Sequence, residues 1–214
     1  MFKTIWIFVG KFFAWYVFFI LILFLGFNKP FAGMFRSVGT MVFKTMWHNV
    51  DVQYKPSYSA QGIAARLRDN DTQIQITNHN LRLPNGYPPM GSVGTNSRLQ
   101  AYLPIAMMIA LSLSLPLALK RSMFIMVIGL VLLCMWILFL LGFVVVVYGE
   151  LSGIGWYGFS QESKQSMQEI LEIILMNQIG LSYIIPFVLW IIIIVCTGDY
   201  RQIVMLLTEK EKSI

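Results

Sequence analysis

The sequence predicts a mainly α-helical membrane protein with four transmembrane helices, a mixed α/β extracytoplasmic loop between spans one and two, and an amphipathic surface helix before span four. The first observation is composition: 57% of the 214 residues are hydrophobic and 12% are charged, about half the charged fraction of a typical soluble domain. The second is a pair of uncharged apolar runs, Leu99–Leu119 and Ser122–Gly149, joined by Lys120 and Arg121. Each run can cross a hydrocarbon core about 30 Å thick, so residues 99–149 are predicted to form a transmembrane hairpin with a basic turn.

Residues 1–27 are interpreted as an N-terminal segment and the first span. Ile5–Phe27 is apolar apart from a few residues, and its helix can begin near Ile5 if the Lys11 amine reaches the headgroups. A cleaved signal peptide has the same basic start. However, the apolar region is long and aromatic, and Asn28-Lys29-Pro30 follows it rather than a small-residue cleavage site. A retained anchor is therefore the favoured interpretation.

Residues 28–98 are the main polar region, and they predict a loop with short strands. Pro30–Trp47 carries apolar residues at helical spacing, which indicates an amphipathic helix lying either at the membrane interface or on the loop's own small core. Val50–Tyr54 and Thr72–Thr77 alternate apolar and polar residues, as strands do. Leu81–Ser97 is rich in proline and glycine and predicts irregular chain. So small a sheet needs the membrane, its own helix or a partner protein for stability.

The rest of the chain contains a second polar connection and a last span. Residues 150–178 predict an outer loop and an amphipathic helix over Ser160–Leu175, with a capping-box spacing at Ser166 and Glu169. Residues 179–197 form the fourth predicted span, and residues 198–214 a cytoplasmic tail with a solvated charge run.

Basic residues predict the orientation of the spans. Cytoplasmic segments carry an excess of Lys and Arg, and long loops cross the membrane largely regardless of charge. We therefore expect both termini in the cytoplasm and both polar connections outside. The topology-determining residues are Lys3, Lys11, Lys120, Arg121 and Arg201.

The sequence offers little for catalysis, transport or cofactor binding. The last three predicted spans contain no Asp, Glu, Lys, Arg or His, groups that coupled transporters usually hold at mid-membrane. His48 with Asp51 could supply two metal ligands on a turn, but two ligands are a weak signal, and a solvated histidine is the simpler interpretation. Cys134 and Cys196 lie in apolar runs and suit packing. We expect no catalytic residue, metal or cofactor, and no nucleic-acid partner, because the basic residues flank spans.

Recognition is therefore expected in the two outer segments, where aromatic, β-branched and polar side chains are available for contact with another protein. The candidate partner surface comprises His48, Asp51, Tyr54, Ile74, Ile76, His79, Trp156 and Tyr157.

The layout resembles one family of small membrane proteins. An aromatic anchor runs through Trp15-Tyr16, a helical hairpin enters at Tyr102-Leu103-Pro104, and the last span contains Pro186-Phe187-Val188-Leu189-Trp190. With the strand-bearing loop between them, this arrangement is similar to proteins of the exosortase-associated family, in particular the exosortase H-associated type.

The resemblance implies a non-catalytic role in the bacterial inner membrane, beside a membrane-embedded peptidase that sorts exported proteins by their C-terminal anchors. The predicted function is thus a non-enzymatic accessory subunit of a protein-sorting, export or envelope-assembly complex, whose partners are membrane lipids and another integral membrane protein. The alternative is a transport or channel component that acts as an oligomer.

Overall fold

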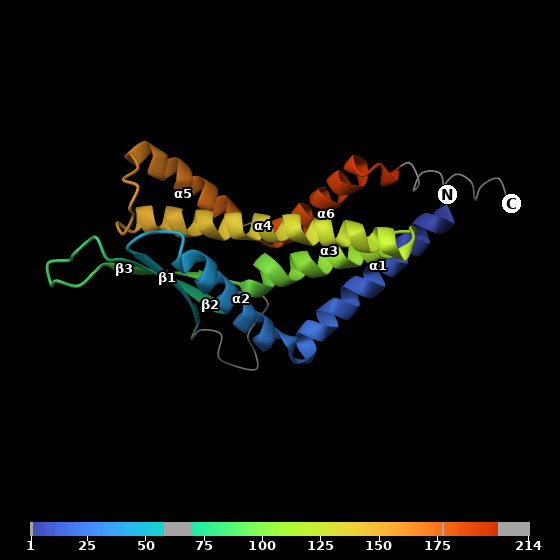
Figure 1. Cartoon of the computed structure of the whole chain (residues 1–214), viewed down its shortest axis with the longest axis horizontal. Coiled ribbons are helices and arrows are strands. Elements are labelled where there is room, and N and C mark those ends of the chain that lie inside the picture. The colour runs from blue at the N-terminus through green and yellow to red at the C-terminus, as the bar shows by residue number, and fades with distance from the viewer. Residues whose placement is uncertain (1, 58–69, 177, 201–214) are drawn as a thin grey trace. The chain divides into compact units, whose positions relative to one another are not determined.

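The computed structural model describes residues 2–57, 70–176 and 178–200. The chain is mostly helical and carries one three-stranded sheet (Figure 1). Its contacts divide it into two compact units. The helical unit comprises the described residues of Met1–Phe27, Tyr102–Met135 and Gly180–Ile214, and the sheet unit comprises those of Asn28–Ala101 and Trp136–Ile179.

Apolar helices build the helical unit, and a small buried cluster joins them. The elements are α1 (Phe2–Ile22), the π-helical turn η1 (Leu23–Phe27), α3 (Leu103–Ser114), the first part of α4 (Leu119–Leu151) and most of α6 (Gln178–Cys196). The buried cluster is Leu115, Ile125, Ile193 and Ile194. Gly26 breaks the helical path within η1 because its φ of +128° is a conformation that favours glycine.

The outward face of α4 in the helical unit is apolar. Met123, Val127, Val131 and Met135 follow one another at four-residue spacing, and their side chains are between 42% and 63% exposed. Ile125 and Leu133 lie buried on the other side of the helix. A continuous apolar stripe of this kind suits contact with lipid better than contact with water.

Two helical stretches, Ile5–Lys44 and Leu119–Leu151, are long and apolar enough to cross a membrane. Shorter apolar helices cover Arg98–Ser114 and Tyr183–Cys196. Length and composition therefore support membrane association, and the arrangement in four spans stays a prediction.

The sheet unit confirms both predicted strands and adds a third. β1 (Val50–Pro56) pairs antiparallel with β2 (Thr72–Asn78), and β2 pairs antiparallel with β3 (Met90–Thr95). The predicted alternation is real: Val52, Ile74 and Ile76 are buried, and their polar neighbours are more exposed. β3 corrects the expectation of irregular chain from Leu81 to Ser97. Most residues of β3 have little intrinsic strand propensity, and their pairing with β2 determines the strand conformation.

Two helices pack against this sheet. The helix α2 (Asn28–Lys44) lies along β1, and the Thr40 hydroxyl accepts a hydrogen bond from the backbone N–H of Tyr54 at 3.0 Å. The last turns of α4 bury Val144 and Val147 in a cluster with Val93 of β3. This packing accounts for the length of α4, which at 1.5 Å per residue is about 50 Å, well beyond a hydrocarbon core of about 30 Å.

Two local details differ from the sequence prediction. Lys120 and Arg121 lie in the first turn of α4, and residues 115–118 make the connection from α3 instead. The helix α5 (Gln161–Met176) is capped by Ser160 and not by Ser166, because the backbone N–H of Ser163 donates to the Ser160 hydroxyl at 3.3 Å.

Gly39 marks a close approach between α2 and the sheet, which gives a first prediction. A Cβ at Gly39 would lie 2.9 Å from ring carbons of Tyr54, and that ring is stacked on Phe43. We expect Gly39→Ala to lower the free energy of unfolding by about 1 kcal/mol, because overpacking outweighs the gain in helix propensity. Thermal unfolding in detergent, followed by tryptophan fluorescence, measures the change.

Gly33 on the same helix is the matched control, since nothing lies within 4 Å of an added Cβ there. Gly33→Ala should raise stability by up to about 1 kcal/mol. If Gly39→Ala and Gly33→Ala change the free energy of unfolding equally and in the same direction, the close approach of α2 to Tyr54 is contradicted.

Candidate functional site

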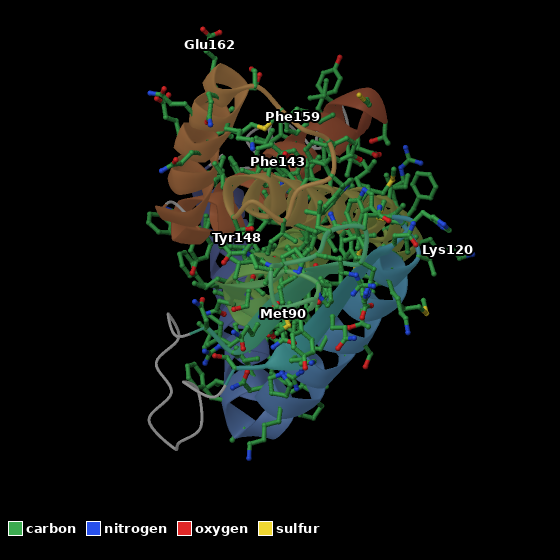
Figure 2. The ribbon with its side chains drawn as sticks, turned by 90° about the vertical axis from the view of Figure 1, so that its left-hand side faces the viewer. Met90, Lys120, Phe143, Tyr148, Phe159 and Glu162 are labelled. Carbon is green, nitrogen blue, oxygen red and sulfur yellow. The ribbon has the colours of Figure 1, made fainter. Side chains whose placement is uncertain are left out.

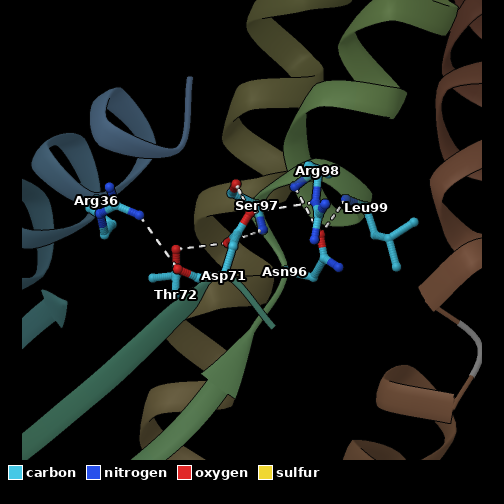
Figure 3. A network of polar contacts seen from close by, with 7 residues as sticks. All are labelled: Arg36, Asp71, Thr72, Asn96, Ser97, Arg98 and Leu99. Atoms are coloured by element: carbon cyan, nitrogen blue, oxygen red, sulfur yellow. Dashed lines mark hydrogen bonds and ion pairs between the residues drawn. The ribbon is translucent and has the colours of Figure 1, made fainter. Parts of the chain in front are cut away.

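A network of polar contacts centred on Asp71 lies where β2 begins (Figure 3). Asp71 Oδ1 accepts hydrogen bonds from the Thr72 hydroxyl at 2.9 Å and the Ser97 backbone N–H at 3.0 Å. Asp71 Oδ2 accepts from the Ser97 hydroxyl at 2.6 Å and lies 3.7 Å from Arg98 Nε. The Arg98 side chain is only 4% exposed. The buried Arg98 side chain thus lies beside the Asp71 carboxylate, which already accepts three hydrogen bonds.

Neighbouring residues tie this network to the helices on either side. Arg36 of α2 donates to the backbone oxygen of Asp71 at 3.4 Å. The Asn96 side-chain oxygen accepts from the backbone N–H groups of Arg98 and Leu99, at 3.0 and 3.1 Å. It therefore satisfies donors at the start of the π-helical turn η3 (Arg98–Tyr102), which leads into α3.

The contacts of this network favour a structural role. The Ser97 hydroxyl donates a hydrogen bond to the Asp71 carboxylate. Neither histidine takes part in the hydrogen bonds of this network. Across the part of the chain that the structure describes, no three His, Cys, Asp or Glu side chains group as a metal site. Sequence reasoning missed the network because Asp71 lies 26 residues before Ser97 in the chain, and only the pairing of the strands brings it close to Ser97 and Arg98.

The residues of the predicted partner surface divide by burial. Three lie at the surface: His48, His79 and Tyr157. Two are half-buried: Asp51 and Trp156. Three belong to the core of the sheet unit and so are not surface residues: Tyr54, Ile74 and Ile76. Burial raises the pKa of the Tyr54 hydroxyl far above its usual value.

The structure does bring some of these residues together. The backbone N–H of His79 donates to the carbonyl oxygen of Asn49 at 2.8 Å, so the two histidines lie at the same end of the sheet. Trp156 packs against Trp47 with ring centroids 5.3 Å apart, and Trp47 Nε1 donates to the Tyr157 hydroxyl at 3.2 Å. Trp47, at the end of the predicted amphipathic helix, is the partner that the sequence did not single out.

A second candidate surface is the loop between β2 and β3, which extends away from the sheet in Figure 1. Hydrogen bonds within the loop shape its tip: the Leu83 N–H donates to Tyr87 O at 2.9 Å, and the Gly86 N–H donates to Leu83 O at 2.8 Å. Gly86 has a φ of +82°, a conformation that glycine adopts readily in turns. The loop and the first residue of β3 expose four large apolar side chains, which we name the loop patch: Leu81, Leu83, Tyr87 and Met90.

The topology-determining residues have different surroundings. Lys11 and Lys120 are exposed, whereas the Lys3 side chain and Arg201 lie outside the described residues. Arg121 Nε donates to both oxygens of Asp199, at 2.8 and 3.1 Å, and the Thr197 hydroxyl donates to Asp199 at 2.6 Å. Burial acts to raise the pKa of Asp199, but the bonds from Arg121 and Thr197 and the charge of Arg121 outweigh it and lower the pKa.

Comparison with known proteins adds no relative. A scan against models of protein families found no match, and searches of curated proteins and of solved structures likewise found none.

Proposed function

We propose that this chain is a non-enzymatic integral membrane protein that acts as an accessory subunit of a protein-sorting, export or envelope-assembly complex. In this proposal it crosses a bacterial inner membrane four times, with both termini in the cytoplasm, and the sheet unit binds another membrane protein outside. The resemblance of the layout to exosortase-associated proteins makes an exosortase-like peptidase the first partner to test.

The loop patch is the observation that best supports a binding site for another protein. Leu81, Leu83 and Tyr87 are between 39% and 70% exposed, yet hydrogen bonds within the loop fix the backbone that bears them. A turn that is already ordered loses little conformational entropy on binding, so apolar side chains on it are suited to contact a partner. Large apolar side chains gathered on one exposed loop are typical of interaction sites.

The ion pair between Arg121 and Asp199 supports the proposed four spans. Arg121 lies at the start of α4, and Asp199 follows the end of α6. The start of one predicted span thus lies next to the end of another, an arrangement that fits the four-span layout.

Affinity purification from native membranes in mild detergent tests the partner proposal. We expect one stoichiometric membrane partner with the unchanged chain, and at least about a tenfold loss of it with Leu81→Asn, Leu83→Asn and Tyr87→Asn combined, because a few apolar anchors carry most interface energy. Mass spectrometry identifies and quantifies the partner.

Met41→Asn and Met46→Asn are matched controls, since both side chains are similarly exposed in the sheet unit but lie outside the loop patch. They should leave the partner bound. A homo-oligomer that conducts ions in liposomes and purifies without a partner would instead favour the alternative, a transport or channel component.

A further inference from the structure

An open cavity of about 500 Å³ lies within the sheet unit, between the end of α4 and the first turns of α5. Its lining is polar and comes from eight residues: Glu150, Leu151, Gly153, Gln161, Glu162, Lys164, Gln165 and Gln168. Figure 2 shows Glu162 at the outer end of α5, beyond Phe143 and Tyr148 of α4.

Glu150 is the most deeply buried charged group of this cavity, with 3% of its side chain exposed. The loop after α4 closes on one side of its carboxylate. The Tyr157 backbone N–H donates to Glu150 Oε1 at 2.6 Å, and a Cβ at Gly155 would overlap the carboxylate. Gly153 and Gly158 turn the chain with positive φ values of +74° and +66°. The loop therefore wraps around one carboxylate, whose other side lines the cavity.

The bonding capacity of Glu150 is only partly used within the described part of the chain. An ionised carboxylate offers about four acceptor sites. Its contacts are the hydrogen bond from Tyr157 and an ion pair with Lys164, whose Nζ lies 3.9 Å from Oε2. That separation is too long for a hydrogen bond. The Lys164 side chain is 26% exposed, so it can move away without disturbing packed structure.

The remaining lining suits a positively charged donor. Two glutamates and one lysine line the cavity, and three glutamines on one face of α5 add side-chain amides that can accept a hydrogen bond. No aromatic ring is among the lining residues, and a quaternary ammonium, which has no N–H donor, is usually held by such rings. A primary ammonium group instead brings three donors to the carboxylate.

We propose that this cavity binds a ligand through a primary ammonium group, with Glu150 as the anchor and Lys164 as the internal counter-ion that the ligand displaces. A soluble amine and the headgroup of an aminophospholipid share this chemistry. The inference does not depend on the proposed membrane partner.

Binding of ethanolamine and of choline to the purified chain in detergent tests the proposal, because the two ligands differ in their N–H donors. We expect ethanolamine to raise the unfolding temperature in a saturable manner and choline to leave it unchanged. Binding of both to the same extent, or of neither, would overturn the proposal. The assay needs no partner, so its result is separate from that of the affinity purification.

Three single substitutions test whether Glu150 binds the ammonium group of ethanolamine. Glu150→Gln should weaken ethanolamine binding by about tenfold or more, since a hydrogen bond to a charged group is lost. Glu169→Gln is the matched control, because Glu169 is exposed on the same helix but does not line the cavity. Lys164→Met removes the competing ammonium and should tighten binding severalfold. It keeps the proposal testable if Glu150→Gln does not fold, and unchanged or weaker binding would contradict it.

Nanodiscs distinguish the source of the amine. Retention of phosphatidylethanolamine, but not phosphatidylcholine, by the purified chain supports a lipid headgroup. Binding of ethanolamine in phosphatidylcholine nanodiscs without retention of phosphatidylethanolamine supports a soluble amine.

Discussion

Replacement of Asp71 by asparagine is expected to destabilise the sheet unit by about 3 kcal/mol. The carboxylate accepts three hydrogen bonds, two of them from Ser97, and it is a counter-charge of the buried Arg98. Asparagine keeps the size but places an amide N–H₂ where an acceptor is needed, and it removes the charge. Breaking one partner of a buried ion pair costs about 3–5 kcal/mol, and the 3.7 Å separation places the effect at the lower end.

Thermal and urea unfolding of the purified chain in detergent measure this change. Asp51→Asn is the matched control, because Asp51 is half-buried and its side chain accepts a hydrogen bond from Gln53 of the same strand. The free energy of unfolding of Asp51→Asn should lie within about 1 kcal/mol of that of the unchanged chain. If the two variants unfold at the same temperature and urea concentration, the Asp71 network does not stabilise the sheet unit.

Replacement of Arg121 by glutamine is expected to destabilise the helical unit by about 2 kcal/mol at neutral pH. Asp199 is 1% exposed and loses its charged donor. The cost is below that of a fully buried pair because the guanidinium is 42% exposed and therefore partly screened. Lys120→Gln removes the same charge from the neighbouring position, where the side chain is exposed, and should have little effect on stability.

The destabilisation by Arg121→Gln should depend on pH. The native pKa of Asp199 is lowered below its unfolded-state value of about 3.9. The stabilisation is therefore complete above that unfolded-state value and is lost as the pH falls through the native pKa. The stability difference between the unchanged chain and Arg121→Gln should accordingly shrink in acid. A difference that stays constant down to pH 2 would contradict the ion pair as its cause.

Periodicity was enough to predict the regular elements that bury one face. Val50–Tyr54 and Thr72–Thr77 alternate apolar and polar residues, and their apolar members are buried in β1 and β2. The helices α2 and α5 follow the predicted helical spacing. β3 escaped prediction because it contains Gly91, Ser92 and Gly94, which have little strand propensity; pairing with β2 decides its conformation.

The candidate sites were less accessible to sequence reasoning, for two physical reasons. The sequence indicates a partner surface at Tyr54, Ile74 and Ile76 because an alternating pattern shows that these residues share an apolar face, but not whether the chain's own helices or another protein cover it. Glu150 and Lys164 come together only because the glycine-rich loop reverses the chain between α4 and α5. A glycine run around a single acidic residue was the one signal that could have pointed to them.

The use of α4 by both units has a consequence for biosynthesis. The sheet is complete in the chain by Thr95, but Val144 and Val147, which cover it, emerge from the ribosome about fifty residues later. During that interval α2 is already made, but Val93 lacks the α4 side chains that cover it, so this part of the nascent sheet is exposed to aggregation or to capture by a chaperone. A fragment that ends before α4 would stay in that state, and residues 28–98 alone should not yield a soluble domain.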